Sequence, residues 1–371
     1  MSDEPIIISN CMKILIVNNS ITYGGASKIL FWLSEVLLKS NFEVSVCYFN
    51  DCSRIFPCGI KCFKLHNELY SSNFITRNTL GLFLSVKKLR SLLIKEKYDL
   101  IISFADHTLY SLFFAKIGLP VKILLSERMD PYSASLSDKI RHLLYCSADF
   151  YVFQTSEASG CFGKRIRSHS KIISNPVVSN KGNVWKYNDN EFVIISVGRL
   201  HITQKRQDIL LYAYQKISKE YPFVSLWIVG SGKDENVLKR MTDKLGISEK
   251  VKFLGYQEDI PGILCKSNLF VLSSDFEGIP NALIEALQCR IPVISTDCSP
   301  GGAKLLLDNG KYGLLVERGK VEPLYHAIKK CLNKDTLNKM SIGEIGALDR
   351  FKEDVIAKQW VEWIKENMQT K

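Results

Sequence analysis

The sequence lacks any uncharged apolar run of the roughly 18 residues that a membrane-spanning helix needs. The best candidate, 109–125, contains Lys116 and Lys122, so we expect no bilayer-crossing segment. The first ten residues, MSDEPIIISN, lack the basic and apolar parts of a secretory signal. We therefore expect a protein of the reducing cytoplasm, in which the eleven cysteines are thiols.

Low-complexity tracts and internal repeats are also missing, which argues against disordered and solenoid architectures. One cluster, Cys52, Cys58, Cys62 and His66, vaguely resembles a metal site. Its spacing matches none of the usual zinc frameworks, so we predict no bound metal.

The chain has 371 residues, which suits two domains of ordinary size. Its net charge of +11 is uneven. Residues 1–185 hold 22 Lys and Arg against 14 Asp and Glu (+8), and the remainder holds 27 against 24 (+3). A basic half attracts phosphorylated or anionic partners such as lipid headgroups. The charge is diffuse and lacks interleaved aromatic residues, so nucleic acid is not an expected partner.

Short apolar runs alternate with segments of helical periodicity, which predicts parallel α/β sheets. The expected strands are 13–19, 42–49, 98–104, 121–126 and 149–155, then 192–198, 224–230, 250–255, 269–274 and 291–296. Helices are expected at 205–220, 233–246 and 280–289, and an amphipathic helix at 353–368. Residues 174–190 are rich in Asn, Pro, Ser and Gly and have the composition of a linker.

The segment 80–97 mixes Leu and Phe with five basic residues and one acidic residue. Its helical spacing gives an apolar face with a basic flank. The pattern fits an ordinary core-facing helix, and it also fits a helix that lies on a membrane surface.

Three segments carry residues suited to binding an anionic ligand. The first is Gly24-Gly25, after the first strand, where glycine allows close approach of a ligand or simply a tight turn. It does not match G-x-G-x-x-G, so a dinucleotide cofactor is not expected. The second is Gly198-Arg199 with Lys205, at the exit of a strand. Arg199 and Lys205 are suited to bind a diphosphate at this position, and the alternative interpretation is that they are ordinary solvated surface charges.

The third segment runs from Ser274 to Glu285. A strand ends, the chain turns at Gly278, and Pro280 suits the first turn of a helix whose free N–H groups favour a phosphate. Glu277 on the entry loop and Glu285 on the helix are placed to accept hydrogen bonds from sugar and ribose hydroxyls. The alternative is that Glu277 and Glu285 are ordinary surface residues that bind no ligand.

Four of these pieces fall in one order: SVGRL with QK (196–205), LWIVGSG (226–232), FEGIPNALIEAL (276–287) and PVISTDCSPGG (292–302). With the trailing GLLV (313–316), they make the chain resemble the retaining glycosyltransferases of family 4. The resemblance implies the GT-B fold, in which two doubly wound Rossmann-like domains face each other across a cleft. It implies an N-terminal acceptor-side domain at 1–180, a nucleotide-sugar-binding domain at 190–350, and a helix at 351–371 that crosses back.

The resemblance also implies roles for individual residues. Arg199 and Lys205 match the cations that bind the donor diphosphate, and Glu277 matches the glutamate beside the donor sugar. Glu285 matches the residue that holds the ribose. The remaining donor-side positions are Gly24, Gly25, Gly198, Ile279, Pro280, Asn281 and Ala282. Members of the family need no metal cofactor.

Two departures from the family pattern concern the acceptor side. Lys304 stands where many members carry Glu, and the chain reads SERMDP (126–131) where many present a His. This variant resembles enzymes that build bacterial surface polysaccharides. The acceptor-side candidates are Asp106, His107, Glu127 and Arg128.

The implied reaction transfers a hexose or N-acetylhexosamine from a nucleotide diphosphate-sugar, with UDP the commonest nucleotide, to a glycan acceptor. A lipid-linked acceptor at the inner face of the cytoplasmic membrane is expected. The alternatives are a nucleotide-sugar epimerase of the same architecture and a non-catalytic protein that binds polyanions or membranes.

Overall fold

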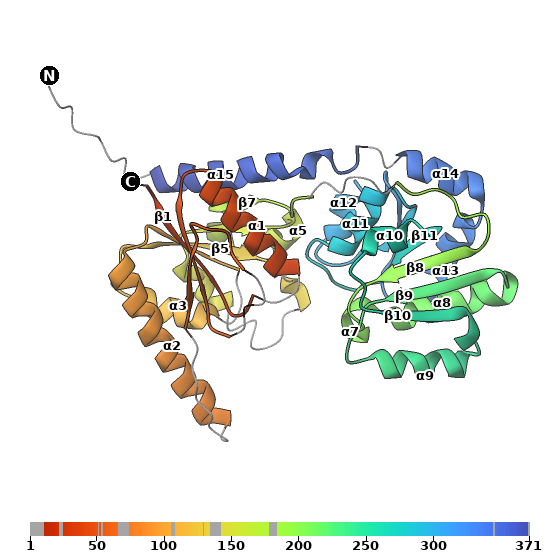
Figure 1. Cartoon of the computed structure of the whole chain (residues 1–371), viewed down its shortest axis with the longest axis horizontal. Coiled ribbons are helices and arrows are strands. Elements are labelled where there is room, and N and C mark those ends of the chain that lie inside the picture. The colour runs from red at the N-terminus through yellow and green to blue at the C-terminus, as the bar shows by residue number, and fades with distance from the viewer. Residues whose placement is uncertain are drawn as a thin grey trace.

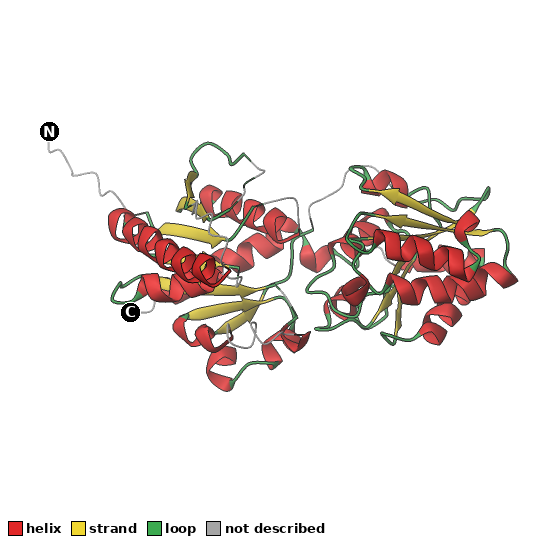
Figure 2. Ribbon diagram, turned by 90° about the horizontal axis from the view of Figure 1, so that it is seen from below, coloured by secondary structure: helices red, strands yellow, loops and turns green. Residues whose placement is uncertain are grey.

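The computed structural model describes residues 11–21, 25–50, 52, 55–65, 74–104, 108–128, 130–133, 142–177, 184–343 and 346–369. Their strands form two separate sheets in which neighbouring strands run parallel, and Figure 1 shows these sheets in two lobes that lie side by side. Helices cover both faces of each sheet (Figure 2). This is the predicted α/β class.

The first sheet has seven strands in the order β3-β2-β1-β4-β5-β6-β7. Its strands are β1 (Lys13–Asn18), β2 (Glu43–Tyr48), β3 (Lys61–Lys64), β4 (Leu100–Ser103), β5 (Lys122–Glu127), β6 (Phe150–Phe153) and β7 (Ser170–Ile172). Its helices are α1 (Gly25–Lys39), α2 (Phe74–Glu96), α3 (Thr108–Lys116), α5 (Ser156–Gly160) and α6 (Lys164–Ser168), with short 3₁₀ turns η1 (Pro131–Ser133) and η2 (Leu144–Ser147).

The second sheet has six strands in the order β10-β9-β8-β11-β12-β13. Its strands are β8 (Phe192–Val197), β9 (Val224–Val229), β10 (Val251–Gly255), β11 (Leu269–Leu272), β12 (Val293–Thr296) and β13 (Leu314–Val316). Its helices are α7 (Ile202–Lys205), α8 (Gln207–Glu220), α9 (Glu235–Leu245), α10 (Ile260–Leu264), α11 (Asn281–Cys289), α12 (Gly302–Leu306), α13 (Val321–Cys331) and α14 (Lys334–Gly343), with 3₁₀ turns η3 (Ser248–Lys250) and η4 (Asp349–Phe351).

Alternate residues of the first-sheet strands belong to different cores, because successive side chains of a strand point to opposite faces. On one face Ile14 and Ile16 of β1 pack with Leu33 of α1, and on the other Leu15 packs with Leu89 of α2. Burial on both faces explains why these strands are nearly continuous apolar runs.

The last helix, α15 (Glu353–Gln369), belongs to the core of the first sheet although it follows the second sheet in the chain. Trp360 is fully buried there, and Trp32 Nε1 of α1 donates to Glu353 Oε1 (2.6 Å). Figure 1 shows α15 lying along the first lobe. The chain crosses between the lobes twice, near Val177 and near Phe351. These two crossings run side by side and are joined by a hydrogen bond from Val177 N to Phe351 O (2.8 Å).

Each of the ten predicted strands is present, and three of the four edge strands were not predicted. These three, β3, β7 and β13, are three or four residues long, and none of their residues is buried. Two of them, β3 and β7, mix polar with apolar residues, and β13 is an apolar run of only three residues, so none matches the longer apolar runs of the predicted strands. In the described part of the chain, no helix combines the length and the apolarity needed to cross a bilayer.

Both sheets reverse their strand order next to their first strand, between β1 and β4 and between β8 and β11. Ligands of open parallel sheets bind at the carboxyl ends of the strands at such a switch point. We therefore expect the ligand-binding residues of the second domain to lie where β8 and β11 end.

Candidate active site

A cleft of about 460 Å³ lies between the two domains at the ends of β8 and β11. Its walls are formed by Ile29, Arg128, Asp130, Gln154 and Asn175 on the first-domain side, and by 197–199, Gln204, Lys205, 276–279, Asn281 and Ala282 of the second domain. The volume lies within the range of about 300–1,000 Å³ that small-molecule sites occupy.

An ion pair between Lys205 Nζ and Glu277 Oε1 lies in the wall of this cleft. The same carboxylate oxygen accepts a hydrogen bond from Ser274 Oγ (2.8 Å), and Glu277 is only 8% exposed. The pair joins the segment after β8 to the loop after β11, two segments that the family resemblance assigns to one donor site.

Lys205 is held in place by a break in the helix predicted at 205–220. Helix α7 ends at Lys205, Arg206 adopts a left-handed conformation (φ 50°), and α8 begins at Gln207. The Arg206 guanidinium donates to Asp275 Oδ2 (2.7 Å) and Asp208 Oδ1 (3.1 Å). These charge-assisted bonds fix the turn that presents Lys205 to the cleft.

Arg199 follows Gly198 at the end of β8 and is exposed at the rim of the cleft. Among the described residues, no carboxylate forms an ion pair with its guanidinium. A guanidinium without a partner, next to a lysine whose charge one carboxylate already balances, leaves a net positive edge for an anion.

Helix α11 directs its amino terminus at the same cleft. Pro280 precedes its first residue, and Asn281 and Ala282 line the cavity. The unpaired N–H groups of a helix amino terminus favour a phosphate oxygen. The arrangement places two cations and a helix terminus around one hollow.

Glu285 lies one turn further along α11 and outside the walls of the cleft. Its nearest charge is Lys28 of α1, in the other domain (Nζ to Oε1 3.6 Å). Burial raises the pKa of Glu285, and Lys28 offsets part of that shift. A carboxylate poised across the domain boundary is suited to accept hydrogen bonds from vicinal hydroxyls.

From the first domain, Arg128 lines the cleft and is bound by its own neighbours. Its Nε donates to Ser126 Oγ (2.9 Å) and its Nη1 to Asn175 Oδ1 (2.6 Å), while Nη2 is buried without a hydrogen-bond partner. Burial lowers the pKa of this guanidinium to about 9, and nearby Glu127 opposes the shift. One donor of this guanidinium is therefore left unsatisfied behind the surface of the cleft.

Asn175 connects the two domains, a role the sequence analysis missed. Its Oδ1 also accepts from Gln154 Nε2 (2.7 Å), and its Nδ2 donates to Asn281 Oδ1 (3.3 Å). The only sequence signal was an Asn-Pro pair inside the segment interpreted as a linker. That segment is packed at both ends, since Asn175 and Trp185 are buried.

The domains approach each other closely at Gly278. A Cβ at this position would stand 2.8 Å from the Arg128 carbonyl oxygen and closer still to Gln154 Oε1. A Cβ on Gly302 would in turn clash with the Gly278 carbonyl oxygen. The absence of a Cβ on both glycines therefore lets these segments pack directly against each other.

The remaining predicted residues fall elsewhere. Glu127 is 2% exposed and bonded to Tyr145 Oη and its neighbour's N–H, so it does not line the cleft. Gly24, Asp106, His107 and His66 lie outside the described residues, and of Gly25 only the backbone is described. Among the residues described, no group of three or more His, Cys, Asp or Glu is arranged to hold a metal ion.

Comparison with known proteins places this geometry in context. A family model described as glycosyl transferases group 1 matches residues 179–344. The chain is 32% identical over 263 residues to an uncharacterized glycosyltransferase of Methanocaldococcus jannaschii, a match that spans 60% of this chain and 64% of that protein.

A second relative is similar along nearly its whole length. This Campylobacter jejuni protein is named GalNAc-alpha-(1->4)-GalNAc-alpha-(1->3)-diNAcBac-PP-undecaprenol alpha-1,4-N-acetyl-D-galactosaminyltransferase. It is 28% identical over 95% of this chain and 98% of its own. The crystal structure of Anabaena HepE with UDP and glucose superposes with a TM-score of 0.76 at 21% identity, covering 96% of this chain and 100% of that one. This likeness confirms the expected GT-B fold.

Proposed function

We propose that this chain is a glycosyltransferase of group 1 and that it moves a hexose or N-acetylhexosamine from a UDP-sugar to a glycan with retention at the anomeric carbon. The observation that carries the proposal is the convergence of Arg199, Lys205 and the amino terminus of α11 on one cleft. A diphosphate is the anion that best matches two cations and a helix terminus.

In this proposal Arg199 and Lys205 stabilise the diphosphate as it departs, which is where negative charge develops. Glu277 and Glu285 accept hydrogen bonds from donor hydroxyls, and Gly198 and 279–282 provide backbone contacts. The acceptor hydroxyl attacks on the face that the diphosphate leaves, and a diphosphate oxygen takes its proton. Because protein cations supply the charge, we propose that the transfer needs no resident metal.

The choice of UDP rests on similarity. Anabaena HepE has been crystallised with UDP and with UDP-glucose. The name of the Campylobacter relative describes an acceptor linked to undecaprenol through a diphosphate. We therefore propose a lipid-linked glycan acceptor in surface polysaccharide or lipopolysaccharide synthesis.

A lipid-linked acceptor requires contact with a membrane, and α2 with the adjacent α3 is the surface we propose for it. Phe83 (63%) and Ile94 (52%) of α2 are exposed, as are Phe114 of α3 (46%) and Ile117 directly after it (59%). Lys87 and Lys95 of α2 are exposed as well. Exposed apolar side chains flanked by lysines match a helix that rests on anionic headgroups.

The proposal is tested by thermal unfolding with UDP, GDP, ADP and a panel of UDP-sugars. A ligand present at 100 times its Kd stabilises the folded protein by about 2.7 kcal/mol. We expect UDP and one UDP-sugar to raise the Tm, and Glu285→Ala to weaken that shift while Glu249→Ala, on the exposed turn η3, does not. If no nucleotide raises the Tm, the donor site is wrong. If the protein converts a UDP-sugar to its epimer when no acceptor is present, the protein is an epimerase and not a transferase.

A further inference from the structure

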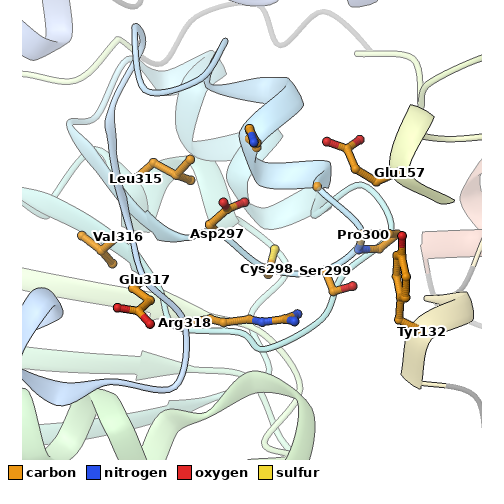
Figure 3. Close-up of a pocket in the computed structure, with 12 residues that line it drawn as sticks. Tyr132, Glu157, Asp297, Cys298, Ser299, Pro300, Leu315, Val316, Glu317 and Arg318 are labelled. Carbon is orange, nitrogen blue, oxygen red and sulfur yellow. The ribbon is translucent and has the colours of Figure 1, made fainter. Parts of the chain in front are cut away.

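A second hollow, of about 680 Å³, opens at the same domain boundary beyond the cleft. Tyr132 of η1 and Glu157 of α5 form its first-domain wall (Figure 3). The loop after β12 (297–301), Lys304 and the end of β13 (315–318) form the other wall. No role has so far been given to this hollow.

The hollow is a neighbour of the donor cleft, with a third hollow between them. An intermediate hollow of about 390 Å³ shares Asp130 and Phe276 with the cleft, and shares Tyr132, Ser299 and Arg318 with the outer hollow. The three hollows therefore adjoin one another along the domain boundary. We call the intermediate and outer parts the seam groove.

The charge of the outer hollow differs from that of the cleft. Its charged residues are Glu157, Asp297 and Glu317 against Lys304 and Arg318, which gives a net charge of −1. The charged residues of the cleft are Arg128, Arg199 and Lys205 against Asp130 and Glu277, which gives +1. A lining of mixed sign with no cationic excess does not suit a phosphate and supplies both donors and acceptors to a neutral ligand.

The side chains of the seam groove suit a ligand with many hydroxyls. Tyr132 is 64% exposed, and its ring offers an apolar face for the C–H side of a sugar ring. Arg318 Nη1 donates to the Asp275 carbonyl oxygen (3.0 Å), which fixes the guanidinium as it extends toward Ser299 (Figure 3). The exposed carboxylate of Asp297 adds a hydrogen-bond acceptor, so that the groove offers both donors and acceptors to a pair of sugar hydroxyls.

The walls of the groove come from both domains and are bonded to each other. Thr155 Oγ1, at the start of α5, donates to the Pro300 carbonyl oxygen (2.6 Å). The Glu157 carboxylate lies against Gly301, where a Cβ would stand 2.8 Å from its Cδ. The groove is thus a product of the domain arrangement that also forms the donor cleft.

We propose that the seam groove binds the acceptor glycan, with its terminal sugar beside Asp130 and Phe276 and the preceding sugars along Tyr132 and Arg318. This proposal rests on the proposed transferase function and deepens it. It assigns to the acceptor a neutral oligosaccharide of more than one residue, because the groove continues well past the point of transfer.

The test is saturation-transfer difference NMR with UDP and with methyl α-glycosides of glucose, galactose, N-acetylglucosamine and N-acetylgalactosamine, together with maltose and melibiose. We expect at least one glycoside to bind to the unmodified protein. Tyr132→Ala and Arg318→Ala should each weaken that binding about tenfold, the loss expected when one anchoring group is removed. Tyr132→Phe, which keeps the ring, should restore most of it.

Matched controls are Tyr212→Ala on α8 and Arg240→Ala on α9, both exposed and away from the groove. They should leave the glycoside signal unchanged, and the UDP signal should persist in every variant and report correct folding. Glycoside binding that is absent, or that survives both Tyr132→Ala and Arg318→Ala, overturns the groove as the acceptor site. Loss of the UDP signal from the unmodified protein would instead overturn the proposed function.

Discussion

Lys205 and Glu277 are 72 positions apart in the chain and form the ion pair at the centre of the cleft. At the scale of single residues, this pair sets the electrostatics of the proposed reaction. Glu277 balances Lys205 in the free protein, so an incoming diphosphate gains most from Arg199 and from the lysine protons that Glu277 does not hold.

Replacing Lys205 with alanine should lower kcat about 100- to 1,000-fold, because a donor aimed at the developing charge is lost. Glu277 would also be left buried and unpaired, which should raise the KM for the UDP-sugar. Steady-state kinetics, with Lys244→Ala on the exposed face of α9 as control, measure both effects. A kcat within twofold of the parent value would show that Lys205 has no part in the chemistry.

The raised pKa of Glu285 gives a pH prediction. A carboxyl whose folded-state pKa exceeds its unfolded value binds its proton more tightly when folded, so its ionisation destabilises the fold as pH rises through that range. Glu285→Gln should therefore be more stable than the parent near neutral pH. The difference should vanish below the unfolded carboxyl pKa of about 4.3.

Urea unfolding at the two pH values checks this expectation, with Glu249→Gln on the exposed turn η3 as the control. Because Glu285 is proposed to hold the donor ribose, the same variant should bind UDP more weakly, a trade of function against stability. Lower stability of Glu285→Gln near neutral pH would mean that the Lys28 contact outweighs the cost of burial.

At the scale of elements, α15 packs in the core of the first domain although it follows the second domain in the chain. Trp360→Ala should destabilise the first domain by about 3–5 kcal/mol, the usual cost of removing a buried Trp side chain. The second domain should be unaffected. Domain-resolved hydrogen exchange measures this, with exposed Lys358→Ala as the control on the same helix. Equal loss of protection in both domains would contradict the assignment.

Helix α2 provides a second prediction at this scale. Phe83→Asp and Ile94→Asp should reduce sedimentation with vesicles of phosphatidylglycerol and phosphatidylcholine several-fold, since each adds charge to an exposed apolar position. Phe223→Asp, equally exposed on the second domain, should not. Binding that is unchanged in the α2 variants would leave this helix without a membrane role.

At the scale of the whole molecule, the site exists only because two domains meet. Gly278→Ala should force the domains apart, since the new Cβ meets a backbone carbonyl at 2.8 Å that has no freedom to rotate away. Small-angle scattering should show a larger radius of gyration, and kcat/KM should fall. Gly160→Ala, where no atom lies within 4 Å of the added Cβ, is the matched control. An unchanged scattering profile would show that local shifts accommodate the new methyl group without moving the domains apart.

Much of the fold was predictable because its signals are local. Buried strands are continuous apolar runs, and the strand exit, the turn at Gly278 and the start of α11 follow one another within a dozen residues. The edge strands β3, β7 and β13 were not predictable, because no burial pattern marks them. The break at Arg206 was missed because its cause, Asp275, is 69 positions away.

The amino-acid sequence alone was sufficient for the fold class and the two α/β series, since each depends on neighbours along the chain. Tertiary structure was required for everything that depends on two distant segments meeting. It paired Lys205 with Glu277, buried Glu127 away from the cleft, and joined Arg128 to Asn281 through Asn175. It also created the seam groove, because a space between domains is defined by how they pack and not by any residue within one of them.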